Sequence, residues 1–237
     1  MNPSIVRSPG EVLLVGGGQI SSCVLSDALA RAETVVAADG GAVPVMALGR
    51  CPDAVIGDLD SLPPEVMQAL PPAVLHRIEE QDSTDFDKCL RHIEAPLVLG
   101  HGFLGARLDH QLAAMTVLAR HPDRRCLLVG EQDVVCLAPP RLALDLPVGL
   151  RLSLYPLAPV RGRSDGLRWP LEGLRFAPDG IVGTSNEVTG PVRLEFETPG
   201  MLLILPLTAQ EALRAGLREA AARWPVPAGQ CKGPRRR

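Results

Sequence analysis

The chain has 237 residues, of which 46% are apolar, and its formal net charge is −3. This length allows one large domain or two small ones, and the apolar fraction is sufficient for a packed core. The net charge gives no sign of the basic face that duplex-binding proteins carry, so we expect no nucleic-acid partner. The longest apolar runs, such as residues 201–205, are far shorter than the roughly 20 residues of a membrane helix, so we expect no membrane contact.

The cysteines indicate a reducing compartment. None of the six forms a CxxC pair, and their spacing fits neither a zinc site nor a dense disulfide framework. Reduced thiols in a cytosolic protein are the simplest interpretation. The N-terminus lacks a cationic segment followed by an apolar run, so we expect no signal peptide. These features predict a cytoplasmic location.

In the first half of the chain, short apolar runs alternate with segments of helical periodicity. Strands are predicted at residues 12–15, 34–38, 54–56, 74–78, 96–99 and 125–129. Helices are predicted at residues 22–31, 42–48, 63–70, 85–93 and 109–120. Strands that alternate with helices imply an open, mostly parallel sheet with flanking helices, so we predict an α/β domain over residues 1–138.

After about residue 138, prolines and glycines recur and the helical periodicity ends. Strands are predicted between turns, at residues 141–145, 150–155, 167–171, 192–197 and 201–206. This pattern is typical of a small antiparallel β-sandwich or barrel. We therefore place a domain boundary near residues 138–140 and a β-rich domain over residues 139–223.

The last segment carries a helix signal and a basic end. Thr208 and Glu211 form a capping-box pattern, which predicts a helix from there to about residue 223. Residues 224–237 are predicted to be a disordered tail. Its final three arginines fall short of a basic patch, so a solubilising tail is favoured over a nucleic-acid or membrane contact.

Nearly every predicted strand of the first half is followed by glycine or aspartate. The loops begin after the strands with Gly16-Gly17-Gly18, Asp39-Gly40-Gly41, Gly57-Asp58, Asp82-Ser83 and Gly100-His101. In an open parallel sheet these loops share one edge, outside the carboxyl ends of the strands, where ligands bind. The sequence therefore predicts that distant glycines and aspartates converge on one crevice.

The first of these loops has two interpretations. Its glycines allow backbone amides to approach phosphate oxygens closely. However, Ser21 stands where a dinucleotide fingerprint carries its last glycine or alanine, and no Walker lysine pattern occurs in the chain. A tight strand-to-helix turn explains the glycines equally well, so this loop alone leaves phosphate binding open.

The carboxylates are more specific. Asp58 and Asp60 project to the same side of an extended loop because they are two residues apart. Asp39 and Asp85 belong to other loops of the same edge, and gathered carboxylates repel one another unless a cation is present. Mg²⁺ suits such a set, because it binds a few carboxylates together with waters and phosphate oxygens. Helix and turn capping is the alternative, above all at residues 82–84.

Several cations accompany these carboxylates. Lys88 lies one helical turn after Thr84 and Asp85, so all three can face the crevice. Lys88 offers a point charge to a phosphate, although a solvated surface lysine is the alternative. Arg107 can hold a phosphate through two parallel hydrogen bonds, and Asp109 can cap the next helix. With no G-x-S-x-G nucleophile in the chain, direct transfer to an acceptor hydroxyl is favoured over a covalent intermediate.

Six short motifs, taken together in this order, resemble the thiamine pyrophosphokinase family over roughly residues 11–206. They are ADGGA at 38–42, GDLDS at 57–61, DSTDFDKCL at 82–90, GARLDH at 105–110, GLRWPL at 166–171 and TSNE at 184–187. One departure is Gln81, which stands where the family often has an acidic residue. The resemblance implies an α/β domain that binds ATP, a C-terminal β domain, and a homodimer with thiamine bound between subunits.

The resemblance also assigns residues. It implies that the catalytic and Mg²⁺-binding carboxylates are Asp58, Asp60 and Asp85. It implies ATP contacts for Asp39, Gly40, Thr84, Lys88, Arg107 and Asp109. It implies thiamine contacts for Trp169, Ser185 and Asn186. Trp169 can stack on the cationic rings of thiamine, while an ordinary core tryptophan and a turn asparagine are the alternatives at 169 and 186.

The expected reaction is attack of the thiamine hydroxyl on the β-phosphorus of ATP, which gives thiamine diphosphate and AMP. Two other functions remain open: a diphosphokinase acting on another small alcohol such as a hydroxymethylpterin, and a non-catalytic sensor of nucleotide or thiamine. An NAD(P) oxidoreductase is disfavoured by the incomplete glycine fingerprint.

Overall fold

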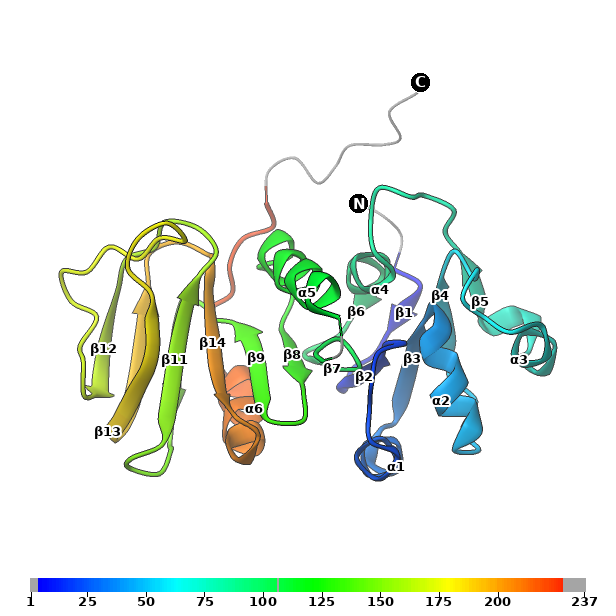
Figure 1. The fold of residues 1–237 in the computed structure, drawn as a ribbon, viewed down its shortest axis with the longest axis horizontal. Coiled ribbons are helices and arrows are strands. Elements are labelled where there is room, and N and C mark those ends of the chain that lie inside the picture. Colours follow the sequence, from blue (N-terminus) through cyan, green and yellow to red (C-terminus); the bar gives the residue numbers. More distant parts are fainter. Residues whose placement is uncertain (1–3, 106, 228–237) are drawn as a thin grey trace, which may run out of the picture.

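The structure is a computed structural model that describes residues 4–105 and 107–227 (Figure 1). It combines a parallel sheet flanked by helices with an antiparallel, β-rich part, so the predicted fold class is confirmed. Within the described ranges, no helix has both the length and the apolar character needed to cross a bilayer.

Six parallel strands form the first part of the sheet. Their order is β8-β7-β2-β3-β4-β5, and their bounds are β2 Val12–Val15, β3 Thr34–Ala38, β4 Ala54–Gly57, β5 Leu75–Arg77, β7 Val98–His101 and β8 Cys126–Val129. After β2 the chain builds outward through β3, β4 and β5, and it then returns to the other side of β2 with β7 and β8. The order therefore reverses between β2 and β7, and the carboxyl ends of the strands there are the usual ligand-binding place of such sheets.

Helices cover both faces of this sheet. Their bounds are α1 Ser22–Arg31, α2 Ala42–Ala47, α3 Pro64–Ala69, α4 Asp85–His92 and α5 Leu108–Arg120. Side chains alternate along each strand, so Leu13 and Val15 pack with α1, while Val12 and Leu14 pack in the core that includes α4 and α5. Figure 1 accordingly shows α4 and α5 on the opposite side of the sheet from α1 and α2.

The sheet continues into antiparallel strands. Their order from β8 is β9-β14-β11-β13-β10, and their bounds are β9 Asp133–Leu137, β10 Arg141–Leu144, β11 Arg151–Pro156, β13 Gly183–Phe196 and β14 Met201–Pro206. The first part of β13 pairs with β11, and its second part pairs with β10 and with β12, Gly162–Leu167. The long strand β13 therefore joins two groups of strands in the β-rich part, one with β11 and one with β10 and β12.

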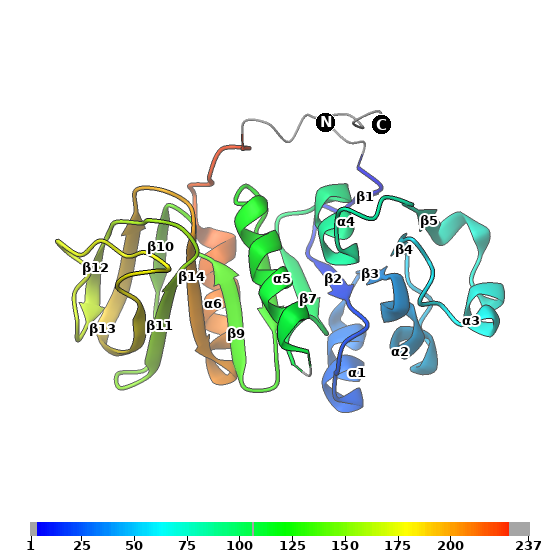
Figure 2. The same ribbon diagram turned by 45° about the horizontal axis from the view of Figure 1, so that its top comes forward.

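The remaining elements are short or peripheral. They are helix α6 Gln210–Glu219, the 3₁₀ turns η1 Asp39–Gly41, η2 Pro72–Val74 and η3 Leu207–Ala209, and the two-stranded pair of β1 Val6–Arg7 with β6 Ile93–Glu94. Helix α6 buries Leu213 and Leu217 in the same core as Leu142 and Leu144 of β10 (Figure 2). It thereby covers the start of the β-rich part.

The predicted elements of the first half largely agree with the structure, but three predictions for the second half are wrong. The strand predicted at 167–171 contains only the last residue of β12, because Pro170 has no N–H and the backbone of Trp169 bonds to the Asn186 side chain instead. The capping box is absent: Thr208 lies in η3, and α6 begins at Gln210 without a side-chain cap. That helix ends at Glu219 rather than near residue 223.

The predicted boundary near residues 138–140 falls between β9 and β10. Strand β9 pairs with β8 on one side and with β14 on the other, so one hydrogen-bonded sheet runs through both parts. The division at residue 138 stays a prediction. At the other end, Trp224 is buried and its Nε1 donates to the Ala138 carbonyl at 2.8 Å, while residues 228–237 lie outside the described part.

Candidate active site

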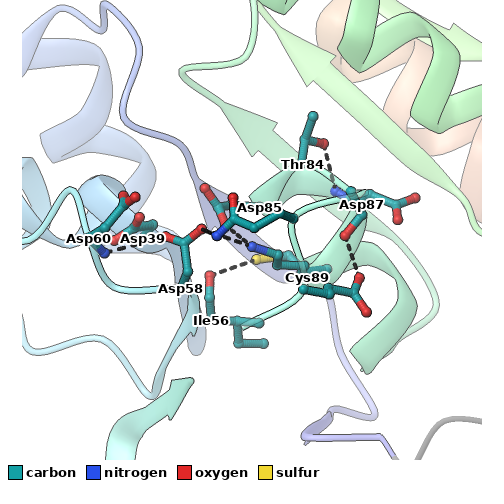
Figure 3. Close-up of polar contacts among 12 residues, drawn as sticks. Asp39, Ile56, Asp58, Asp60, Thr84, Asp85, Asp87 and Cys89 are labelled. Atoms are coloured by element: carbon teal, nitrogen blue, oxygen red, sulfur yellow. Dashed lines mark hydrogen bonds and ion pairs between the residues drawn. The ribbon is translucent and has the colours of Figure 1, made fainter. Parts of the chain in front are cut away.

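Carboxylates from two neighbouring loops meet at the carboxyl edge of the parallel sheet (Figure 3). Asp39 follows β3, and Asp58 and Asp60 follow β4, which is the adjacent parallel strand. One carboxylate oxygen from each of the three lies within 4.8 Å of the others. The convergence that the loops predicted is therefore present for these three aspartates.

Asp39 is the most buried member, with 2% of its surface exposed. Its Oδ2 accepts a hydrogen bond from the Ser61 amide at 3.3 Å, but its buried Oδ1 has no partner among the described residues. Burial raises the pKa of Asp39 to about 6, although the Ser61 hydrogen bond opposes this and the neighbouring Asp85 adds to it. An unpartnered, buried carboxylate oxygen is costly unless it meets a proton or a cation.

The loop after β4 holds its two aspartates in place through local hydrogen bonds. The Asp60 amide donates to Asp58 Oδ1 at 3.3 Å, and Ser61 Oγ donates to Asp60 Oδ1 at 3.1 Å. Leu59 has a left-handed backbone with φ of 66°, and Asp39 likewise has φ of 43°. Non-glycine residues adopt this conformation only where the surrounding structure requires it, often at functional sites.

Lys88 completes the cluster from α4. Its Nζ lies 3.0 Å from Asp85 Oδ1 and 3.3 Å from Asp58 Oδ2, and its side chain is only 1% exposed. Burial acts to lower the pKa of Lys88, but its two carboxylate partners outweigh that effect and raise it. Burial likewise acts to raise the pKa of Asp58, yet the Asp60 amide and Lys88 bring it below its ordinary value. Both groups are therefore charged at neutral pH.

The donor set fits a divalent cation. The carboxylates at positions 39, 58 and 60 lie close together, and the buried ammonium of Lys88 pairs with those at 58 and 85. Hard oxygen ligands with remaining negative charge are what Mg²⁺ binds. The unpartnered Oδ1 of Asp39 is a further free ligand atom. The sequence predicted Asp58, Asp60 and Asp85 as the metal ligands. In the structure Asp39 is the aspartate grouped with Asp58 and Asp60, whereas Asp85 pairs with Lys88.

The neighbouring loops show what the other predicted positions do. Thr84 is the N-cap of α4, where its Oγ1 accepts from the Asp87 amide at 3.2 Å. Gly40 is part of η1, next to Asp39. Gln81, which the sequence reasoning did not select, donates from Nε2 to Asp58 Oδ2 at 3.3 Å. Its place at the start of the aspartate-rich loop is the only signal that pointed to it.

The glycines after β2 serve packing. The amides of Gly16 and Gly18 donate to the carbonyls of His101 and Gly102 at 2.8 and 3.1 Å, so these two are not free for a phosphate. A Cβ on Gly18 would lie 2.4 Å from the Gly102 carbonyl oxygen. This favours the tight-turn interpretation of these two glycines, in which two loops at the switch point of the sheet approach closely.

Arg107 and Asp109 pair with each other. Arg107 donates from Nε and a terminal nitrogen to the two Asp109 oxygens at 3.2 and 2.6 Å, and both side chains are about two-thirds exposed, at 66% and 65%. Helix α5 begins at Leu108 with Arg107 as its N-cap residue, so the prediction that Asp109 caps this helix is wrong. In this arrangement Arg107 reaches outward rather than toward Asp58.

A cavity of about 660 Å³ lies beside this pair. Its walls come from α5, from the turn between β8 and β9, and from β9, β11 and β14, and include Gln19, Gly105, Gln111, Met115 and Tyr155. The walls are largely apolar, with amide side chains and the carboxylates of Glu131 and Asp133 among them, and mostly apolar walls with a few polar groups are typical of small-molecule sites. The cavity adjoins the loops after β2 and β7, two strands from the carboxylates.

The predicted thiamine contacts form a second cluster. Asn186 is 5% exposed, and its side chain accepts from the Trp169 amide at 3.1 Å and donates to the Trp169 carbonyl at 2.7 Å. The Trp169 ring is 53% exposed and lies 5.0 Å from the Arg168 guanidinium. Ser185 has a left-handed φ of 61°, and its amide donates to Ser153 Oγ at 3.0 Å. Asn186 thus fixes the loop that presents an exposed tryptophan.

The two clusters are far apart within one chain. Strand β13 is seven strand positions from β3 in the sheet order, which corresponds to a separation on the order of 30 Å. Figure 1 shows these strands toward opposite ends of the molecule. A single copy therefore does not place Trp169 beside Asp58.

Comparison with known proteins identifies what the α/β half resembles. Residues 25–128, which include β3, β4 and α4 with their carboxylates, match the family model described as the catalytic domain of thiamin pyrophosphokinase. Over this segment, which is a little under half of the chain, the protein is similar to the thiamin pyrophosphokinase family. The resemblance seen in the sequence motifs is thereby confirmed.

Plant thiamine pyrophosphokinases are among the relatives. Thiamine pyrophosphokinase 1 of Arabidopsis thaliana is 29% identical over 156 residues, which cover 58% of each chain. Thiamine pyrophosphokinase 3 of Oryza sativa subsp. japonica is 29% identical over 192 residues, which cover 67% of this chain and 72% of that one. The match thus spans a little under three-fifths of the Arabidopsis relative.

Solved thiamin pyrophosphokinase structures share the fold. The yeast enzyme gives a TM-score of 0.70 at 16% identity, with 86% of this chain and 92% of that chain covered. The Candida albicans enzyme gives 0.69 at 17% identity, with 86% and 93% covered. The Geobacillus thermodenitrificans protein gives 0.67 at 23% identity, with 83% and 96% covered.

Proposed function

We propose that this chain transfers diphosphate from ATP to the hydroxyl of thiamine and releases thiamine diphosphate and AMP. The observation that supports this best is the cluster of Asp39, Asp58 and Asp60 at the ligand-binding edge of the sheet, next to the buried Lys88, which pairs with Asp58 and Asp85. The relatives named as thiamine pyrophosphokinases favour thiamine over a pterin alcohol as the acceptor.

In this proposal Asp58 and Asp60 hold Mg²⁺, with Asp39 and Asp85 next to them. When bound, the ion offsets the negative charge of the triphosphate and of the transferring group. Lys88 contributes a fixed positive charge, since both its carboxylate partners keep it protonated. The side chains thus orient the triphosphate for in-line attack, and a neighbouring carboxylate takes the proton of the acceptor hydroxyl.

We place the nucleoside of ATP in the cavity beside α5. This cavity shares the sheet edge with the carboxylates, and the loops after β2 and β7 lie between the two. A triphosphate leaving the cavity would therefore pass these loops on its way to Asp58. Thr84 and Gly40 are next to Asp85 and Asp39, where the far end of the triphosphate would lie. Arg107 and Asp109 flank Leu108 of the cavity wall, and Arg107 can exchange its carboxylate partner for a phosphate.

Thiamine requires a second copy of the chain. The Trp169 cluster is too far from the carboxylates of its own chain, but it presents an exposed aromatic face suited to a flat cation. A homodimer that sets this cluster against the carboxylate edge of its partner would complete the site. The thiamine cation would then replace the Arg168 guanidinium on the face of the Trp169 ring. A cytoplasmic location completes the proposal.

An acceptor assay with ATP and Mg²⁺ tests the proposed function. AMP should form with thiamine and not with hydroxymethylpterin, and Asp58→Asn should lower kcat at least about 100-fold, which is roughly 3 kcal/mol of transition-state stabilisation. AMP release with the pterin alone would transfer the assignment to that acceptor. Thermal stabilisation by thiamine and ATP without AMP formation would identify a sensor instead.

A further inference from the structure

Helix α4 carries two sets of charged side chains. Asp85 and Lys88 are three residues apart and face the carboxylate cluster. Asp87 and Arg91 are four residues apart and pair with each other, and the helical period of 3.6 residues places Asp87 about 200° around the helix from Asp85. This second set contacts the end of α5 and the loop before α4 instead of the carboxylate cluster.

A buried hydrogen-bonded contact joins this second set to the end of α5. Asp87 Oδ1 lies 2.7 Å from Nε2 of His121, and the two side chains are 8% and 5% exposed. His121 is the C-cap residue of α5. Burial acts to raise the pKa of Asp87, but the hydrogen bond and charge of His121 bring it below its ordinary value. The contact therefore ties the first turn of α4 to a second helix.

Arg91 extends the contact to the loop before α4. It donates to the Glu80 carboxylate, which also accepts from Ser83 Oγ, and it lies 3.6 Å from Asp87 Oδ2. The same loop carries Gln81, which donates to Asp58. We call the set Glu80, Ser83, Asp87, Arg91 and His121 the α4 brace.

Stability alone is a weak reason for such a brace. Helix α4 already buries Phe86, Cys89 and Leu90 in the main core. A buried ion pair contributes little net stability compared with apolar residues of the same size, because both groups lose their hydration. What a directional, buried pair adds to apolar packing is a fixed rotation and tilt of the helix.

We propose that the α4 brace is a positioning device for diphosphate transfer, an inference that rests on the proposed function. Its members act through Asp85, Lys88 and Gln81 and are not catalytic residues. A tilt of α4 would move Lys88 and Asp85 together away from Asp58, whose Oδ2 now lies 3.3 Å from Lys88 Nζ. Displacements of about 1 Å at a reacting centre can cost about 100-fold in rate.

The test uses the full chain with two Asp87 variants and a matched control. Asp87→Ala removes the brace, whereas Asp87→Asn keeps an oxygen that can accept from His121. The control is Glu11→Ala, which breaks another half-buried ion pair, with Arg214 at 2.6 Å, ahead of the amino end of β2 and so at the opposite edge of the sheet. Two experiments are carried out. Steady-state kinetics gives kcat and the KM values for thiamine and ATP, and electron paramagnetic resonance gives the affinity for Mn²⁺ without nucleotide.

We expect Asp87→Ala to lower kcat at least about 10-fold, to leave KM for thiamine within about 3-fold, and to weaken Mn²⁺ binding. Asp87→Asn should recover most of the loss. Glu11→Ala should lower the melting temperature while kcat stays within about 2-fold. If Asp87→Ala does not fold, His121→Gln takes its place in the comparison.

Normal kcat and Mn²⁺ affinity in folded Asp87→Ala would overturn the positioning role. An equal loss of kcat in Glu11→Ala would do the same, since it would reduce the effect to general destabilisation. If the unmodified chain releases no AMP while Asp87→Ala still weakens Mn²⁺ binding, the proposed function fails and with it the role in diphosphate transfer, and what stands is that the brace positions the carboxylates that bind the metal.

Discussion

Replacing Asp39 with asparagine should stabilise the metal-free chain at neutral pH while impairing its activity. The side chain is buried, its Oδ1 has no hydrogen-bond partner in the described part of the chain, and burial raises its pKa to about 6. Asparagine has the same shape, can accept the Ser61 hydrogen bond, and tolerates the left-handed backbone at this position. The substitution therefore removes a buried charge and little else.

The size of the effect follows from the pKa. An aspartate in an unfolded chain titrates near 3.9, and one pKa unit corresponds to about 1.4 kcal/mol, so ionised Asp39 costs the fold about 3 kcal/mol at pH 8. The folded chain binds the proton more tightly than the unfolded chain. The stability that protonation provides is thus fully present below about pH 4 and is lost as pH rises through about 6. At pH 5 about half of the cost remains.

Urea unfolding in EDTA at pH 5 and pH 8 measures both values. Asp39→Asn should exceed the unmodified chain by up to about 3 kcal/mol at pH 8 and by about 1.5 kcal/mol at pH 5. The same variant should release AMP more slowly with Mg²⁺ and ATP. An equally or less stable variant at pH 8, with the same pH dependence as its parent, would show that Asp39 is not a strained charge.

Three further substitutions test other parts of the structure. Lys88→Met leaves two carboxylates without their buried cation, so the free energy of unfolding in EDTA should fall by about 3 kcal/mol or more, and an unchanged urea midpoint would contradict this. Asn186→Ala leaves the Trp169 amide and carbonyl unpaired and should cost about 2–4 kcal/mol, with altered tryptophan fluorescence. Gly41→Ala would place its Cβ 2.0 Å from a carbonyl oxygen of β2 and should lower the melting temperature sharply, whereas Gly190→Ala, in open space, should not.

The α/β half could be predicted well because its strands and helices are marked by apolar periodicity. The bounds predicted for β2, β3 and α1 agree with the structure, since each is a clear apolar run or stripe. Strand β12 carries no such mark, because its sequence GRSDGL has one apolar residue and two glycines. It forms through pairing with the long strand β13, a tertiary contact that local propensity does not encode.

The site was predictable to the level of its loops. Glycine and aspartate at strand ends indicate a shared edge, and Asp58 and Asp60 do meet there. Whether Asp39 or Asp85 stands closest to them depends on side-chain directions that only the fold determines. The contact of Asp87 with His121 and the role of Asn186 in holding the Trp169 loop likewise depend on tertiary contacts, and no sequence spacing indicates them. The pairs Arg107–Asp109 and Asp87–Arg91 are local, at two and four residues apart, but which partner each charged side chain takes is determined by the fold.

The unbroken sheet has a mechanical consequence. Hydrogen bonds cross from β8 to β9 and from β9 to β14, so the α/β half and the tryptophan-bearing half are parts of one continuous sheet. Because the sheet is continuous, its two halves have no hinge about which they could close around a ligand. In the proposed reaction, water would therefore be excluded by another surface that covers the edge of the sheet. The turnover rate would then depend on how fast that surface associates and dissociates.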